Sequence, residues 1–267
     1  MTNAGRSRAG YRAEYFELLS LVEERHFWFR ARRRSIIAAT RLISERNSIR
    51  NIVEHGCGTG FMLAELQRSF PHARVTGTDL FPEAIAAARR HFAGPLIQID
   101  LFEWKSSETF DLIGFFDVLE HIDADILALR ALREQLRPGG HLLLTVPAHM
   151  ALWSRYDIAA GHCRRYDRRR LMDCLLRGGF EVKYCTEFMC ALFPLMWARR
   201  RWFGRSPAAA HSASPERAEI ERELRIYPLL NGILRSILRP EAWWIRHGYR
   251  LCGGTSLLAL ATPKGTD

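Results

Sequence analysis

A glycine-rich loop is the strongest chemical signal in the sequence. Residues 52–60 read IVEHGCGTG, so a short apolar strand leads through the acid Glu54 into three glycines at alternate positions. Glycine lets a backbone bend sharply and approach a ligand closely, and the helix expected next offers unpaired N–H groups at its start. The dinucleotide-binding pattern GxGxxG would need glycine at position 61, where this chain has Phe61. The loop therefore predicts a ligand site and counts against an NAD-dependent oxidoreductase.

Acidic residues follow the strands expected after this loop. Asp79 comes 19 residues after Gly60, where a carboxylate can accept both hydroxyls of a ribose. Asp100 ends the next strand, placed to accept from an exocyclic amine, and residues 116–121 (FDVLEH) follow the fourth strand. Each acid alone could simply cap a turn or a helix. Open α/β sheets bind ligands at the carboxyl ends of adjacent strands, so together these residues predict one site there.

Histidines near the same edge of the sheet are candidate general bases, because imidazole suits proton transfer near neutrality. His121 follows the fourth strand, His149 follows the fifth, and His162 lies in the loop after it. We order the candidates His121, His162, His149, and each could instead be a surface or core histidine. Asp117, Glu120 and His121 also form a D-x-x-E-H pattern whose side chains could share a divalent ion. Aspartate is shorter than glutamate at the first position, and we expect no metal.

The pattern of apolar residues predicts an α/β fold. From residue 51 onward, short apolar strands alternate with helices, which indicates a parallel sheet with helices on both faces. Residues 138–140 (PGG) are expected to end a helix and turn the chain into the fifth strand. The strands are expected at 52–53, 74–78, 96–99, 110–116, 141–146, 180–186 and 256–262, and the helices between them at 62–69, 82–92, 123–136 and 171–176.

Three regions follow from these elements. Residues 1–48 form an N-terminal helical lid segment, residues 49–186 with 255–264 form the ligand-binding core, and residues 187–254 form a helical cap on the substrate side. Nearly seventy residues that no hairpin needs thus separate the last two strands. They comprise an aromatic-rich helix at 188–203, a Ser/Ala/Pro-rich linker at 204–215, a charged helix and an apolar segment at 227–238. The helix at 188–203 could pack on the domain, which we favour, or lie in a membrane interface as a peripheral contact.

Composition limits the class of protein. The chain has 267 residues, of which 48% are apolar and 25% charged, an ordinary globular balance. Its longest apolar run, residues 188–198, is too short to span a bilayer, and its polar start lacks a signal-like apolar stretch. Six cysteines without a CxxC pair indicate reduced thiols rather than zinc sites or disulfides. We therefore expect a cytoplasmic protein.

The net charge of +10 is concentrated at the two ends of the chain. Residues 1–50 carry +6, residues 51–150 carry −5 and residues 151–267 carry +9. Such flanks could face nucleic acid, an anionic lipid surface or an acidic small molecule, or could simply be a solvated surface. The sequence has no recognisable nucleic-acid-binding module, so nucleic acid is not expected as a partner.

Taken together, the motifs resemble those of the class I S-adenosylmethionine-dependent methyltransferases, in the branch with quinone-biosynthesis and natural-product enzymes. The resemblance covers about residues 26–186 and 255–262 and rests on EHGCGTG, GTDLFPEAI, IQIDL, FFDVLEHI and LRPGGHLLLTVP. It implies a Rossmann-like sheet of seven strands in the order 3-2-1-4-5-7-6 and S-adenosylmethionine as cofactor. It also implies methyl transfer by in-line displacement to a small-molecule acceptor, at oxygen, nitrogen or carbon. His55 departs from the small or apolar residue usual at its position, which leaves its contacts open.

The resemblance also implies which residues hold the cofactor. Glu54 and the loop residues Gly56, Cys57, Gly58 and Gly60 would surround the methionine portion. The other positions are Asp79 and Leu80 near the ribose, Asp100 and Leu101 at the adenine, and Phe116 and Asp117 at the sulfonium. Residues 26–34 (HFWFRARRR) are similar to a segment that closes over the cofactor, with Trp28 over the sulfonium and Arg33 on the methionine carboxylate. The alternative is a helix that packs its aromatic residues on the core.

In this family the stretch after the fifth strand commonly faces the acceptor. Arg164 and Arg165 suit a carboxylate or phosphate group, and Trp153, Tyr156 and Tyr166 suit a planar ring. A solvated basic turn is the alternative. The acceptor is expected to be an aromatic, lipid-like or carboxylate-bearing metabolite. An RNA or peptide acceptor on the basic flanks, or a protein that binds the cofactor without turnover, are the other hypotheses.

Overall fold

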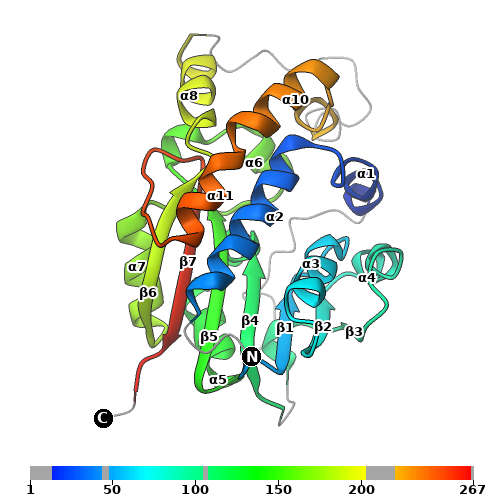
Figure 1. Cartoon of the computed structure of the whole chain (residues 1–267), viewed down its shortest axis with the longest axis vertical. Helices are drawn as coiled ribbons and strands as arrows, with labels where there is room; N and C mark the ends of the chain where they lie inside the picture. The colour runs from blue at the N-terminus through cyan, green and yellow to red at the C-terminus, as the bar shows by residue number, and fades with distance from the viewer. Residues whose placement is uncertain (1–13, 44–47, 105–107, 203–219, 266–267) are drawn as a thin grey trace.

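A seven-stranded sheet forms the centre of the computed structural model, which describes residues 14–43, 48–104, 108–202 and 220–265 (Figure 1). The strand order is β3-β2-β1-β4-β5-β7-β6. The strands are β1 (Asn51–His55), β2 (Arg74–Asp79), β3 (Leu96–Gln98), β4 (Phe110–Phe116), β5 (Leu136–Pro147), β6 (Phe180–Phe188) and β7 (Ser256–Pro263). Neighbours pair in parallel except β7, which runs antiparallel to both β5 and β6. The predicted fold class and strand order are therefore confirmed.

Helices cover both faces of the sheet (Figure 1). Those described are α1 (Glu14–Val22), α2 (Phe27–Ala39), α3 (Phe61–Ser69), α4 (Pro82–Ala88), α5 (Asp125–Glu134), α6 (Arg155–Ala159), α7 (Arg168–Arg177), α8 (Leu192–Trp202), α10 (Pro228–Ile237) and α11 (Arg239–Arg246). On one face, α2, α3 and α11 contribute Ile36, Leu63 and Ile245 to the core. On the other face, α5 and α7 contribute Leu129 and Leu175. The sheet is thus the middle of three layers.

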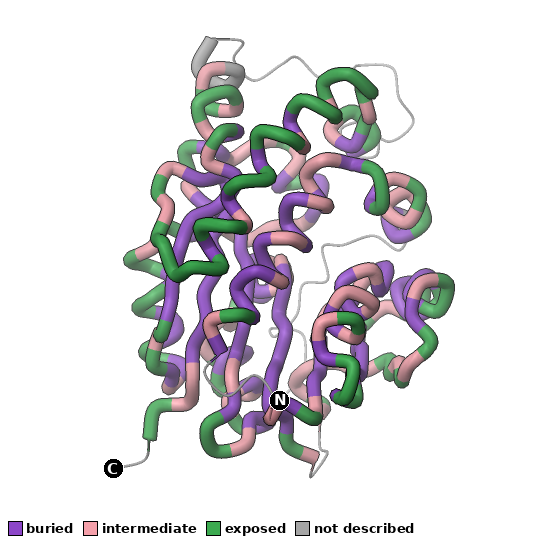
Figure 2. The backbone as a smooth tube through the Cα atoms, viewed as in Figure 1, coloured by how far each residue is buried: buried purple, intermediate pink, exposed green. Residues whose placement is uncertain are grey.

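Successive residues of the central strands face opposite sides of the sheet. Ile52 and Val53 of β1 belong to cores on opposite faces, as do Leu143 and Leu142 of β5. Every residue of β4 is buried, and Figure 2 shows the sheet as the buried interior of the molecule. Because both faces are covered, these strands read as continuous apolar runs. The carboxyl ends of β1, β2 and β4 then lie together at one edge, where the glycine loop begins.

The start of β5 differs from the prediction. Helix α5 ends at Glu134 and β5 begins at Leu136, so residues 138–140 (PGG) lie inside the strand and not in a turn before it. Leu136 pairs with Phe110 of β4, and the register between the two strands then shifts, as it does at a bulge. Strands tolerate proline and glycine at such irregularities, so a local turn signal was misleading here.

The segment after β6 also begins differently from the prediction of a helix from residue 188. Strand β6 extends through Phe188, and α8 starts only at Leu192. Met189 has a φ of 59°, and the Glu241 carboxylate of α11 accepts hydrogen bonds from the N–H groups of Met189 and Cys190. A contact between residues far apart in the sequence therefore sets this boundary.

Helices α8, α10 and α11 occupy the region that the sequence predicted as a cap. Figure 1 shows α10 and α11 beside α2, and Leu234, Leu238 and Ile245 join the core on that face of the sheet. Part of this region thus covers the sheet itself. The predicted linker at 204–215 and residues 1–13 of the lid segment lie outside the described residues, and the division into three regions stays a prediction. None of the helices described is long and apolar enough to cross a bilayer.

Gly60 is required by backbone shape and by close packing. Its φ is 80°, and a Cβ built there would lie 2.9 Å from the Cα of Ala88 in α4. We expect Gly60→Ala to lower the free energy of unfolding by about 2 kcal/mol, because side chains rarely adopt this conformation and a backbone neighbour cannot yield cheaply. Urea unfolding followed by circular dichroism measures the change.

The matched control for this prediction is Gly232→Ala in α10, where a Cβ would meet nothing within 4 Å. Replacing a helix glycine at an open position leaves the free energy of unfolding unchanged or raises it by up to about 1 kcal/mol. Equal unfolding free energies for Gly60→Ala and Gly232→Ala would contradict the packing role of Gly60.

Candidate active site

A cavity of about 540 Å³ opens at the carboxyl ends of β1, β2 and β4. Its walls come from the glycine loop, the loops after β2, β3 and β4, the first two helices, and α8 and α10. Ligands of open α/β sheets bind at this edge. The predicted cofactor residues that line the cavity are Trp28, Glu54, Gly56, Cys57, Gly58, Asp79, Leu80, Asp100, Leu101, Phe116 and Asp117, and the predicted acceptor-side residues that line it are His121, Tyr156, His162 and Arg165.

Other predicted site residues are not brought to this cavity. Arg164 pairs with the Asp125 carboxylate at 2.9 Å, and the Tyr166 hydroxyl donates to the same group at 3.2 Å. His149 Nε2 lies 3.1 Å from a carboxylate oxygen of Glu187. These contacts turn the three side chains toward other parts of the fold. The predicted residues outside the cavity wall are Arg33, Gly60, His149, Trp153, Arg164 and Tyr166.

Glu54 places an unsatisfied acceptor in the cavity wall. Its side chain is buried, and its Oε2 has no hydrogen-bond partner among the described residues. Burial raises the pKa of the Glu54 carboxyl well above its usual range, although the charge of Arg32 opposes this. Gly58, which lines the same cavity, also leaves open space there, because a Cβ built at Gly58 would meet only a Phe16 ring atom, at 3.9 Å. A buried acceptor next to open space fits a cationic group of a ligand, which would return the carboxyl to its ionised form.

Asp79 is held at the end of β2 by the backbone of two loops. Its Oδ2 accepts from Gly58 N–H at 2.9 Å and its Oδ1 accepts from Phe81 N–H at 3.0 Å. Each carboxylate oxygen keeps a further acceptor position, so the oriented group can still bind a ribose diol. Asp100 accepts from Phe102 N–H at 2.9 Å at the start of a short 3-10 helix. It therefore caps a turn and lines the cavity at once.

Of the two neighbouring arginines of α2, Arg32 lines the cavity and the predicted Arg33 does not. The Arg32 Nη2 donates to the Phe116 carbonyl at 2.8 Å, and its guanidinium pairs with the Asp117 carboxylate. Arg33 instead lies over the ring of Phe61, at 5.2 Å from the ring centroid. Helical spacing could have indicated which of the two arginines faces the cavity. Positions 28 and 32 are four apart and share a face of α2, whereas position 33 is turned away from position 28.

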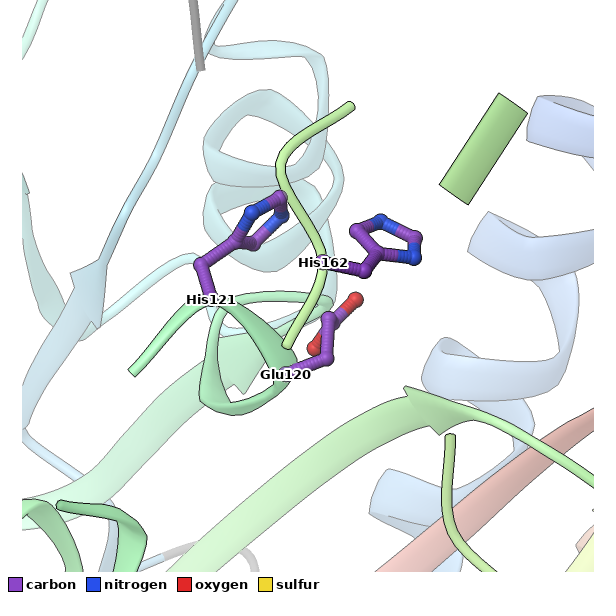
Figure 3. Close-up of side chains that lie close together, drawn as sticks. All are labelled: Glu120, His121 and His162. Atoms are coloured by element: carbon purple, nitrogen blue, oxygen red, sulfur yellow. The ribbon is translucent and has the colours of Figure 1, made fainter. Parts of the chain in front are cut away.

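Glu120, His121 and His162 form a cluster in the cavity wall (Figure 3). Their potential ligand atoms lie within 4.8 Å of one another, close enough to share a divalent ion. Glu120 and His121 come from the turn after β4, and His162 comes from a separate loop. Both Glu120 oxygens lack a hydrogen-bond partner among the described residues. The expectation that no metal binds stays a prediction.

Burial changes the chemistry available to two members of this cluster. It raises the pKa of Glu120 well above its usual range, and the nearby charge of Asp117 adds to the increase. It lowers the pKa of His121 to about 3, with a contribution from His162. His121 is therefore a neutral, weak base at neutral pH, and burial favours the protonated form of Glu120. This does not favour His121, which we placed first among the candidate bases.

His162 is held by a buried carboxylate whose role the sequence analysis missed. Asp157 is fully buried, and its Oδ1 lies 3.0 Å from His162 Nδ1 and accepts from Arg165 Nε at 2.7 Å. Burial raises the pKa of Asp157, but the hydrogen bond to His162 and the charge of Arg165 outweigh it and hold the pKa below its usual range. An ionised carboxylate only accepts, so Nδ1 carries the hydrogen and Nε2 remains the basic atom.

His55 is a buried imidazole at the end of β1. Its Nδ1 lies 2.7 Å from Thr78 Oγ1 and its Nε2 lies 2.8 Å from Gln135 Oε1. Burial lowers the pKa of His55 to about 4. Between about pH 6.5 and pH 4 the unfolded chain therefore binds a proton at this residue that the folded chain does not. The stability that His55 contributes is complete above this window and is lost as the pH falls through it.

We expect His55→Gln to flatten the loss of stability on acidification. Between pH 6.5 and 4 the free energy of unfolding should fall less steeply in the variant, by up to about 1.4 kcal/mol per pH unit. Urea titrations at several pH values measure both slopes, and His72→Gln, at an exposed position, is the control. Parallel slopes for His55→Gln and the unchanged protein would contradict a buried neutral imidazole.

Comparison with known proteins identifies the family. Residues 27–184 match the family described as a methyltransferase domain. The chain is 29% identical over 137 residues to the malonyl-[acyl-carrier protein] O-methyltransferase of Halalkalibacterium halodurans, over 47% of this chain and 51% of that protein. It is 32% identical over 113 residues to the ubiquinone biosynthesis O-methyltransferase of Xanthomonas campestris, over 38% of this chain and 46% of that protein. The chain spans about half the length of the curated relatives it matches.

Solved structures share the fold over most of the chain. One is the putative methyltransferase of Haloferax volcanii, in its complex with the Trm112 methyltransferase activator. Its TM-score is 0.60 at 15% identity, over 96% of this chain and 95% of that one. A second is an S-adenosylmethionine-dependent methyltransferase from Clostridium acetobutylicum, with a TM-score of 0.50 at 12% identity, over 86% of this chain and 92% of that one.

The residues at the cavity fit S-adenosylmethionine. The unpartnered Glu54 suits its ammonium group, the oriented Asp79 suits its ribose hydroxyls, and the space beside Gly58 lets a ligand approach the backbone. The matched family covers more than half of the chain, including the loop and the strand ends that carry these residues. The chain therefore belongs to the methyltransferase-domain family, with the class I fold and S-adenosylmethionine as its cofactor.

Proposed function

We propose that this chain methylates a hydroxyl or amine of a small-molecule acceptor and that His162 is the general base. The observation that carries the proposal is the Asp157–His162 pair, which opens onto the same cavity as Glu54 and Asp79. A base and the cofactor residues thus share one enclosed space. The two curated relatives described above are O-methyltransferases, which supports oxygen as the acceptor atom.

The protein's own contribution is mainly alignment. S-adenosylmethionine supplies a methyl group that the sulfonium charge has already activated for in-line displacement. Asp79 would hold the ribose of the cofactor and Glu54 its ammonium group, and Trp28 of α2, which lines the same cavity, would cover it. Fixing the acceptor atom in line with the methyl carbon accounts for much of the rate, since well-oriented reactants gain on the order of 7–11 kcal/mol. Arg32 holds the loop after β4 in place, because it donates a hydrogen bond to the Phe116 carbonyl and pairs with the Asp117 carboxylate.

Proton removal is the second contribution. His162 Nε2 accepts the proton that the hydroxyl or amine loses as its lone pair attacks the methyl carbon. Asp157 keeps Nδ1 protonated and stabilises the imidazolium that results. His121 packs edge-on against His162, with ring centroids 4.8 Å apart, and so supports the orientation of the base. Leu195 and Leu230 add apolar surface to the cavity wall, which favours an acceptor with an apolar part.

Methyl-labelled S-adenosylmethionine tests this function. The full chain is incubated with it and an extract of the source cells, and the products are separated into organic-soluble, water-soluble, RNA and protein fractions. We expect label in small molecules, chiefly in the organic-soluble fraction. Label that is confined to RNA or protein, or tight cofactor binding without any transfer, would contradict the proposal.

A further inference from the structure

Helix α10 presents a row of apolar side chains to solvent. Leu229, Ile233 and Ile237 are 81%, 47% and 50% exposed. They are spaced four residues apart, so they form one stripe along the helix. A shallow groove runs along this stripe between Pro228 and Ile237. Singly exposed apolar residues are ordinary, but a continuous row of them marks an interaction surface.

Aromatic residues extend this surface along the chain. Trp243, Trp244 and Tyr249 are exposed on α11 and just after it. Helices α10 and α11 bury Leu234 and Ile245 in the same core beside α2, so the exposed sides of both helices face away from that core. Figure 2 shows exposed residues along the outer side of this helix pair. Tryptophan and tyrosine suit a boundary between water and hydrocarbon, because each has an apolar body and a polar edge. We call residues 227–250 the outer face.

The charges of the outer face have one sign. Between residues 227 and 250 the exposed charged side chains are Arg239, Arg246 and Arg250, and Arg235 is half-buried. The only acid in this range, Glu241, is buried and bound to backbone N–H groups of Met189 and Cys190. An apolar stripe with arginines around it is complementary to a bilayer that contains anionic lipids.

The outer face is fixed in this outward orientation. Asn231 of α10 accepts a hydrogen bond from Phe27 N–H at 2.7 Å and donates one to the Arg25 carbonyl at 3.1 Å. Both bonds tie the start of α10 to the start of α2. The apolar stripe therefore stays on the surface while the opposite side of α10, with Leu234, stays in the core.

The outer face is also continuous with the cavity. Tyr227 and Leu230 are exposed and line the cavity wall as well. Leu195 and Met196 of α8 line the same wall, and Leu195 is exposed. The apolar surface thus leads directly to the acceptor side of the site.

We propose that the outer face docks on the surface of an anionic lipid bilayer. Leu229, Ile233 and Ile237 enter the boundary between headgroups and acyl chains, and the arginines pair with lipid phosphates. Docking places the apolar cavity wall against the bilayer. This proposal rests on the proposed function. Together the two imply that the methyl acceptor has an apolar tail and reaches the cavity from the membrane. The sequence analysis gave membrane contact by residues 188–203 as the alternative to packing on the domain, and this proposal instead places the membrane contact on α10 and α11.

Vesicle flotation of the full chain tests the docking surface. We expect the chain to float with vesicles in which a third of the phosphatidylcholine is replaced by phosphatidylglycerol, and much less with phosphatidylcholine alone. The double substitution Leu229→Glu with Ile233→Glu should reduce flotation at least tenfold. The matched control is Met172→Glu with Leu176→Glu, two exposed apolar residues four apart on α7, which should float like the unchanged chain.

A second variant keeps the test independent of any packing defect. Arg239→Gln with Arg250→Gln alters only exposed side chains, and it should weaken binding to the anionic vesicles and reduce its dependence on salt. Absence of flotation by the unchanged chain, or equal flotation by the unchanged chain and all three variants, would overturn the proposal. So would a dimer in analytical ultracentrifugation that the Leu229→Glu and Ile233→Glu changes dissociate, since the stripe would then bind a second copy. Flotation requires no methyl transfer, so its failure leaves the proposed reaction standing.

Discussion

Asp79→Ala is expected to weaken binding of S-adenosylmethionine by about 100-fold or more. Its carboxylate is the group that we expect to bind the ribose hydroxyls, and hydrogen bonds to a charged acceptor contribute about 1.5–3 kcal/mol each. Two N–H groups, from Gly58 and Phe81, hold that carboxylate in place, so its energy is not spent on ordering a flexible side chain. Titration calorimetry with S-adenosylmethionine or its demethylated product measures the dissociation constant.

Two further variants separate ligand contact from loop structure. Asp79→Asn keeps one oxygen acceptor for the loop backbone but lacks the charge, and its affinity should fall between those of the other two forms. Glu83→Ala removes an exposed carboxylate from the first turn of α4 and should change the affinity less than twofold. Unchanged affinity in Asp79→Ala, or equal losses in Asp79→Ala and Glu83→Ala, would contradict the assignment of Asp79 to the ribose.

His162→Ala is expected to slow methyl transfer by about 100- to 10,000-fold, the range that a positioned general base supplies. Cofactor affinity should change little, because the base faces the acceptor. Asp157→Asn should slow transfer as well, since it removes the charge that orients His162 and stabilises its protonated form. The initial rate of label transfer from S-adenosylmethionine into the organic-soluble fraction of a cell extract measures both effects.

His149→Ala is the matched control for the general base. The sequence offered His149 as an alternative candidate, and the structure places it against Glu187, outside the cavity wall. Its replacement should leave the rate of transfer within a few-fold of the unchanged protein. A full rate in His162→Ala, or the same loss in both histidine variants, would contradict the role of His162.

Much of the fold could be predicted because its signals are local. The glycine loop, the alternation of strands with helices and the continuous apolar strands each follow from short stretches of sequence. The errors arose where distant residues decide the outcome. The Glu241 carboxylate binds the N–H groups of Met189 and Cys190 and so sets the boundary between β6 and α8. Leu136 pairs with Phe110 of β4, so β5 begins before the PGG segment and includes it. Neither contact is visible in the local pattern.

The candidate site divides in the same way. Glu54, Asp79 and Asp100 could be placed at the binding edge of the sheet from the sequence, because each lies at or just after the carboxyl end of a strand. The place of Arg32 depends on which face of α2 meets the cavity, and its neighbour Arg33 is chemically alike. The role of Asp157 depends on its buried contacts with His162 and Arg165. Burial, which only the folded chain defines, makes His121 a weak base. Helical spacing from Trp28 was the one available signal for Arg32.

The most direct test of the central claim is a crystal structure of the chain with S-adenosylhomocysteine. The account predicts the adenosyl group in the cavity at the ends of β1, β2 and β4, with both ribose hydroxyls bonded to Asp79 and the sulfur on the side that faces His162. A ligand bound elsewhere on the molecule, or a ribose that does not contact Asp79, would contradict it.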